Sequence, residues 1–163
     1  MKSWLVSYAR YNEWANRRLT DCLMSGVVQV EQPVVSSFPG IMPTLLHMWD
    51  AEHIWWQRVK MKDQIDRPSE SFSGDLQKLT QHLLLQSAEW ASWVSAATEA
   101  ALAHEFIYRN NKREQFKQPV ADVLIHLFNH QSYHRGQIVT MLRQLGATQI
   151  PALDYIVFTR KGK

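Results

Sequence analysis

The feature that most constrains the fold is an amphipathic stretch that runs from Pro119 to Leu145 and is followed by Gly146. Proline is tolerated in the first turn of a helix, and glycine is favoured just beyond its last turn. On an α-helix the main apolar residues of this stretch lie within about 60° of one another around the axis. The pattern therefore predicts a long helix with one buried face. That face comprises Val123, Leu127, Ile138, Met141 and Leu145.

Three of the seven histidines lie on this predicted helix, at His126, His130 and His134. A four-residue step turns about 40° round a helix, so the three rings project from one side. His134 falls within the apolar stripe and His130 at its edge, whereas His126 falls outside it, on the flank. Buried neutral imidazoles need hydrogen-bond partners, and one metal ion can satisfy two of them at once. The spacing favours His130 and His134 as metal ligands, with a pair of core histidines bonded to nearby polar groups as the alternative.

A third ligand has to come from another helix. The pattern predicts a second helix from about Ile41 to Met61, and His47 lies in its first half. His53 lies about 240° further round this helix and cannot share a site with His47. We interpret His53, His82 and His104 as solvent-exposed or boundary histidines, because histidine is usually only partly buried. His47 is therefore the favoured third ligand on pattern alone.

Two further amphipathic stretches complete a set of four long helices. One runs from Trp4 to near Gly26, and the other follows a predicted cap at Ser73, with Asp75 in its positive first turn. A loop is expected over residues 27–40 and another over 62–72. Four helices of this length in 163 residues predict a single all-α domain over residues 1–163, with the architecture of a four-helix bundle.

A small β-hairpin is expected between the third and fourth helices. Aromatic residues flank the polar sequence Asn110-Asn111-Lys112, and asparagine readily accepts the left-handed turn geometry that tight hairpins need. The flanking residues are Phe106, Tyr108 and Phe116. After the last long helix, an apolar run over 155–158 leads to a basic end that we expect to be frayed.

Composition excludes several classes of function. The formal charge of +3 is spread along the chain, so no basic patch indicates nucleic-acid binding. Cys22 is the only cysteine, which excludes an intrachain disulfide and a thiolate metal cage and is compatible with a reducing cytosol. No run reaches the roughly 18 apolar residues of a membrane span, and the first residues do not form a secretion signal. We therefore expect a cytoplasmic protein that binds neither nucleic acid nor membrane.

Three blocks of the sequence resemble the DinB superfamily, the DinB/YfiT-like metalloenzymes. They are Tyr-Asn-Glu-Trp-Ala-Asn at 11–16, Thr-Leu-Leu-His-Met-Trp-Asp-Ala-Glu-His-Ile-Trp at 44–55 and His-Leu-Phe-Asn-His-Gln-Ser-Tyr-His-Arg-Gly-Gln at 126–137. With the tail around Asp154–Phe158, the likeness spans nearly the whole chain. One departure is Tyr133, where many relatives have a second adjacent histidine; this changes the rim of the site but removes no ligand.

The resemblance implies a four-helix bundle with a long crossover connection, often a homodimer. It also implies a three-histidine metal site, which falls on His47, His130 and His134, in agreement with the helical spacing. Three imidazoles with one open position suit Zn²⁺ or Ni²⁺. A tryptophan-rich second helix, apolar on more than one face, is further reason to expect deep burial or a subunit interface.

Several polar residues have predicted roles around this site. Asp50 is either a partner of His47, a fourth ligand, a proton acceptor or a solvated acid. Gln137 is interpreted as a polar boundary residue, with a bond to a metal-bound group as the alternative. Arg135 lies about 140° round from His130 and is predicted to make an ion pair at the surface or at an interface. Structural hydrogen bonds are expected from Tyr11, Asn12 and Asn16.

Two functional hypotheses follow. The first is a metal-dependent enzyme that acts on an unidentified small molecule, either a hydrolase or a transferase of low-molecular-weight thiols, as some relatives of the superfamily are. The second is a non-catalytic, stress-associated bundle in which the metal mainly rigidifies the fold. A metal-free structural dimer is a third option. The sequence contains no phosphate-binding glycine loop and no other cofactor fingerprint, and its catalytic residues are not identified.

Overall fold

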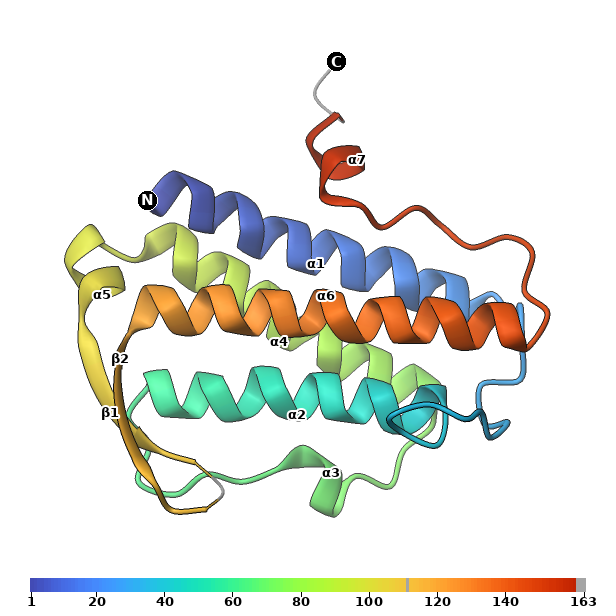
Figure 1. Ribbon diagram of the computed structural model, residues 1–163, viewed down its shortest axis with the longest axis horizontal. Helices are drawn as coiled ribbons and strands as arrows, with labels where there is room; N and C mark the ends of the chain where they lie inside the picture. Colours follow the sequence, from blue (N-terminus) through green and yellow to red (C-terminus); the bar gives the residue numbers. More distant parts are fainter. Residues whose placement is uncertain (111, 161–163) are drawn as a thin grey trace.

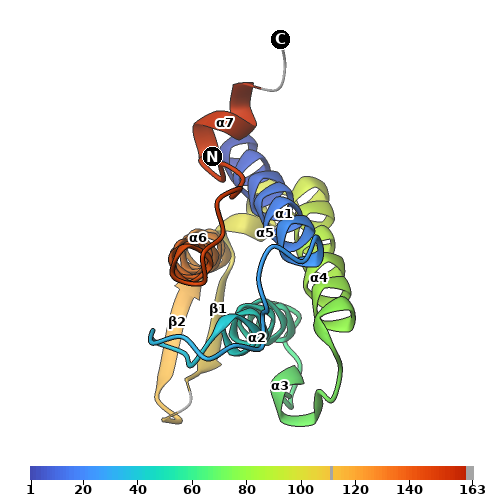
Figure 2. The ribbon, with the colours of Figure 1, turned by 90° about the vertical axis from the view of Figure 1, so that its right-hand side faces the viewer.

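Four long helices packed side by side make up most of the protein. The computed structural model describes residues 1–110 and 112–160. The long helices are α1 (Lys2–Met24), α2 (Ile41–Val59), α4 (Leu76–Ala96) and α6 (Val120–Gln144). Viewed along their axes, α1 packs against α4 and α6, and α2 packs against the same two helices from the other side (Figure 2). The predicted all-α bundle is therefore confirmed.

The long crossover lies between α2 and α4. Helix α2 ends beside the hairpin, and the chain then runs the length of the bundle before α4 begins at the other end (Figure 1). This connection contains the short helix α3 (Pro68–Ser71), in a stretch predicted as loop. Two more short helices, α5 (Glu99–Ala103) and α7 (Tyr155–Thr159), follow later in the chain. They are too short for the apolar periodicity of a long helix to predict them.

The N-cap of helix α4 lies two residues later than the sequence suggested. Asp75, not Ser73, is the N-cap, because its carboxylate accepts a hydrogen bond of 2.9 Å from the backbone N–H of Lys78. The predicted end of α6 is confirmed, since Gly146 has a φ of +90°, in the left-handed region that glycine accepts without strain.

The predicted hairpin is confirmed as strands β1 (Glu105–Arg109) and β2 (Gln115–Pro119), which pair antiparallel with Tyr108 opposite Phe116. Its turn differs from the expectation at Asn110, which does not take the left-handed conformation. Arg113 takes the left-handed conformation, with a φ of +64°. Asn110 instead uses its side-chain oxygen to accept hydrogen bonds from the backbone N–H groups of Lys112 and Glu114. Asn111 and the basic end at 161–163 lie outside the described residues.

A buried polar layer divides the interior into two apolar clusters. One cluster surrounds Trp90 and Phe128, towards the hairpin, and the other surrounds Leu45 and Ile138, towards the opposite end. On each long helix, fully or almost fully buried polar side chains lie between the residues of the two clusters: Asn12 and Asn16 on α1, Glu52 on α2, Ser87 on α4 and Arg135 on α6. Within the described part of the chain, no helix is both long enough and apolar enough to cross a membrane.

Candidate metal centre

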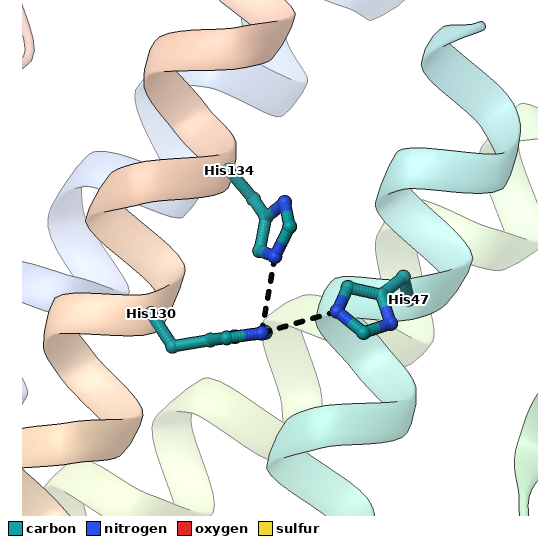
Figure 3. Close-up of side chains that lie close together, drawn as sticks. All are labelled: His47, His130 and His134. Carbon is teal, nitrogen blue, oxygen red and sulfur yellow. Dashed lines mark hydrogen bonds between the residues drawn. The ribbon is translucent and has the colours of Figure 1, made fainter. Parts of the chain in front are cut away.

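Three histidine side chains converge between α2 and α6 (Figure 3). His47 reaches out from α2, and His130 and His134 reach towards it from successive turns of α6. The Nε2 atom of His130 lies 3.1 Å from Nε2 of His47 and 3.0 Å from Nε2 of His134. One nitrogen from each ring lies within 4.8 Å of the other two, so the group could hold a metal ion. These are the three residues that the sequence pattern favoured.

The other four histidines do not join this group. His126 is exposed on the flank of α6, with its ring centroid 5.9 Å from that of His130. His53 is half-buried and bonds to Gln86 through Nδ1. His82 is exposed and stacks on a tryptophan ring, and His104 is exposed beside β1. Their predicted positions at the surface or at its boundary agree with the structure.

Hydrogen bonds among the residues that the structure describes do not satisfy all three rings at once. Nδ1 of His134 lies 2.7 Å from Oε1 of Gln137, and an amide oxygen only accepts, so the ring proton lies on Nδ1. Nε2 of His134 then presents a lone pair towards His130. His130 Nδ1 is buried and has no hydrogen-bond partner among the described residues. Whichever nitrogen of His130 carries the proton, a buried polar atom is left unsatisfied.

The donor set fits a divalent metal ion. Two nitrogens bound to one zinc ion at about 2.0–2.1 Å lie roughly 3 to 3.5 Å apart, and the Nε2 atom of His130 lies 3.1 and 3.0 Å from those of His47 and His134. Burial lowers the pKa of all three histidines, and the neighbouring rings lower that of His130 further, to about 3. All three are therefore neutral near pH 7, which is the form that binds metals.

Gln137 and Asp50 form hydrogen bonds that connect the region of the three histidines to neighbouring segments of the chain. Gln137 accepts from His134 and donates through Nε2 to Ser37 Oγ at 2.8 Å, so it fixes the ring and ties it to the loop before α2. Asp50 is buried rather than solvated, and its carboxylate accepts a 2.9 Å hydrogen bond from the backbone N–H of Ser69 in α3. Asp50 thus anchors the crossover beside His47.

Aromatic rings border the three histidines. The ring centroids of Phe38 and His47 are 4.6 Å apart, and those of Tyr133 and His134 are 5.1 Å apart. Tyr133 is 62% exposed, so it forms an outer rim, as its position in the sequence suggested. Phe38 was missed by the sequence analysis because it lies in an irregular loop, where no periodicity places a side chain.

The prediction for Arg135 is wrong. Arg135 is only 2% exposed and donates hydrogen bonds to the side-chain oxygens of Asn12, at 2.7 Å, and Asn16, at 2.8 Å. It does face away from α2, as its helical angle indicated. However, α6 also packs against α1 on that side, so the direction away from His47 leads into the interior and not to solvent.

Glu52 is a buried acid that the sequence analysis overlooked. Its carboxylate accepts hydrogen bonds from Asn12 at 2.8 Å, from Asn16 at 3.3 Å and from Ser87 at 2.9 Å. Because Arg135 donates to the same two asparagines, the amides bridge a buried cation and a buried carboxylate. A signal was available, since Glu52 continues the buried stripe of α2 four residues after Met48.

The pH dependence of stability should reveal Glu52. Burial raises its pKa from 4.5 to about 7, against the partial lowering by its hydrogen-bond donors and by Arg135. Between these values the folded state binds more protons than the unfolded state, so the free energy of unfolding falls as the pH rises. Over this pH interval, the ionisation of Glu52 should lower the free energy of unfolding by roughly 3 kcal/mol. This pH-dependent loss of stability should be absent from Glu52→Gln. Urea unfolding at a series of pH values measures it, and equal pH dependence of the unfolding free energy in the two proteins would contradict the prediction.

Comparison with known proteins agrees with this architecture. A family model described as the DinB family matches residues 1–161. The chain belongs to the DinB family. It is 24% identical to the protein DinB of Bacillus subtilis (strain 168), over 95% of this chain and 93% of that protein. A crystal structure of a DinB-like protein from the same species covers 93% of this chain and 98% of its own, with a TM-score of 0.63. At 14% sequence identity, that similarity supports the fold alone.

Proposed function

We propose that this DinB-family protein is a metal-dependent enzyme whose ion, Zn²⁺ or Ni²⁺, is held by His47, His130 and His134. The observation that carries the proposal is the convergence of three Nε2 atoms around a position where protein hydrogen bonds leave His130 unsatisfied. Three neutral imidazoles leave one coordination position open, as is typical of catalytic rather than structural sites. When bound, such an ion supplies a Lewis acid, an activated water or an activated thiolate.

The residues of the chain supply orientation and enclosure. Gln137 holds the ring of His134 with Nε2 towards the other two histidines. The ring of Phe38 packs against that of His47, and the ring of Tyr133 packs against that of His134, so both aromatic side chains border the position of the ion. The substrate is an unidentified small molecule. The reaction classes that suit this site are hydrolysis and the transfer of a low-molecular-weight thiol to an electrophile.

An open coordination position separates this proposal from a non-catalytic metal bundle. Protein loaded with Co²⁺ should change its visible absorption when azide or a small thiol is added, because the added ligand enters the metal's coordination shell. Protein without cobalt, treated in the same way, is the control. An absorption spectrum that stays constant at saturating azide and thiol would favour a metal that only rigidifies the bundle.

The homodimer and the cytoplasmic location stay predictions. All three tryptophans of α2 are half-buried, and Trp56 packs edge to face on Trp90 of α4 in the same chain, with ring centroids 4.9 Å apart. The tryptophan-rich sequence of α2 is thus used within the bundle. Size-exclusion chromatography with light scattering would measure the oligomeric state directly.

A further inference from the structure

A cavity of about 550 Å³ lies between strand β1 and the segment after α2. This volume is in the range of small-molecule binding pockets. Most of its lining is apolar, and three of the lining side chains are large hydrophobic residues with substantial exposure: Met61, Ile65 and Ile107. Arg58 and Tyr108 also line the cavity. The cavity therefore combines apolar walls with a guanidinium group.

Arg58 is fixed in place but has hydrogen-bonding capacity to spare. Its guanidinium carbon lies 4.6 Å from the ring centroid of Trp55 and 5.2 Å from that of Tyr108. One Nη atom donates to the backbone oxygen of Arg109 at 3.0 Å, whereas the buried Nε atom has no hydrogen-bond partner in the described part of the chain. Over residues 1–110 and 112–160, no carboxylate forms an ion pair with Arg58. An arginine held in this way presents a preformed site for an anion.

The charges around the cavity favour a negatively charged ligand. Burial is the main cause that lowers the pKa of Arg58 and of His47, and charge repulsion from Arg67, at the start of α3, lowers both further. Lys62 and Arg109 add two cationic side chains to the lining. Of the two acids in the lining, Glu105 is paired with Lys117 at 2.8 Å, which leaves Asp63. Cations therefore outnumber the available acids, and a bound anion would relieve their repulsion.

Arg58 also lies on the same side of α2 as His47. Eleven residues separate them, which corresponds to about 16 Å along the helix and about 20° around it. Aromatic rings span this interval in steps. The ring centroids of His130 and His126 are 5.9 Å apart, and those of His126 and Trp55 are 5.8 Å apart. The guanidinium of Arg58 in turn stacks on the ring of Trp55.

We infer that Arg58 binds an anionic group, a carboxylate or a phosphate, of the small molecule whose reacting end lies at the three histidines. The anion site itself stands on the cavity and on Arg58. Only its link to the reacting end rests on the proposed function. Trp55 and His126 form the wall along which the molecule extends.

Titration of the metal-free protein tests the anion site. Benzoate and phenyl phosphate carry the two anionic groups, and benzamide is the neutral probe; binding is followed by shifts of backbone amide NMR signals. We expect Arg58→Gln to weaken binding of the preferred anion roughly ten- to hundredfold and to leave benzamide unchanged. Arg58→Lys should retain part of the affinity, and Arg10→Gln, at an exposed arginine of α1, should retain all of it. Equal affinity for anions and benzamide, or an unaffected Arg58→Gln protein, would overturn the inference.

A second arm tests the link to the histidines. Cobalt-loaded protein is titrated with mercaptohexanoate, mercaptooctanoate and mercaptoundecanoate, each compared with the mercapto alcohol of equal length. At the chain length that spans the two sites, the acid should bind at least about tenfold more tightly than the alcohol, and Arg58→Gln should remove the difference. No advantage at any length would overturn the link. A wild-type protein that binds no cobalt would overturn the proposed function and leave the result with the metal-free protein intact.

Discussion

Replacing Arg135 with methionine is expected to lower the free energy of unfolding by about 3–5 kcal/mol. Arg135 is buried and donates two hydrogen bonds to the buried side-chain oxygens of Asn12 and Asn16 and one to the half-buried Ser132. Removing the guanidinium leaves the side-chain oxygens of Asn12 and Asn16 without the donors of Arg135 and removes the positive charge that favours the ionised form of Glu52. Methionine has a similar length, so the loss of charge and hydrogen bonds dominates over the loss of volume.

Urea unfolding near neutral pH measures this effect. The matched control is Arg10→Met at an exposed position, for which a change within about 0.5 kcal/mol is expected. Adding Glu52→Leu to Arg135→Met should recover part of the loss, because the two partners of a buried charge pair are then removed together. A change below about 1 kcal/mol for Arg135→Met would show that the buried polar layer does not hold the helices together.

The burial of Arg135 could not be predicted from the sequence pattern. Periodicity gave its direction on α6 correctly, but direction becomes burial only when the neighbouring helices are known. Its angle predicts an ion pair at the surface or at an interface, but α1 packs against α6 on that side, so the side chain is buried within the chain. Glu52 illustrates the same limit, because its carboxylate is stabilised by donors from α1 and α4 that no local pattern connects to it.

The three histidines were predictable for a different reason. His130 and His134 lie one turn apart on a single helix, so their common direction follows from helical geometry alone. His47 was favoured by its position on α2, and the resemblance of three sequence blocks to the DinB superfamily pointed to the same residue. Phe38 lies in a loop without periodicity, and the Gln137–Ser37 hydrogen bond depends on that loop. The position of Phe38 and this hydrogen bond could not be predicted from the spacing of residues in the sequence.

The second large effect that we expect is the stabilisation of the folded protein by a bound metal ion. With free Zn²⁺ or Ni²⁺ at about a thousand times its dissociation constant, the free energy of unfolding should rise by about 4 kcal/mol. The reason is that the three converged nitrogens exist only in the folded protein. His134→Ala should abolish this gain, since it removes a ligand and the ring that Gln137 holds.

Thermal unfolding with and without metal, followed by circular dichroism, measures the gain. His104→Ala, at an exposed histidine beside β1, is the control and should respond to metal like the wild type. An equal metal-induced shift in wild type and in His134→Ala would mean that the stabilising ion binds elsewhere.

The most direct test of the central claim is the metal stoichiometry of purified, zinc- or nickel-reconstituted protein, measured by elemental analysis. We expect one ion per chain in the wild type and in His126→Ala and His53→Ala, and far less than one in His47→Ala, His130→Ala and His134→Ala. Loss of the metal in the His126 or His53 variant, with full occupancy in the other three, would contradict the assignment of the site to His47, His130 and His134.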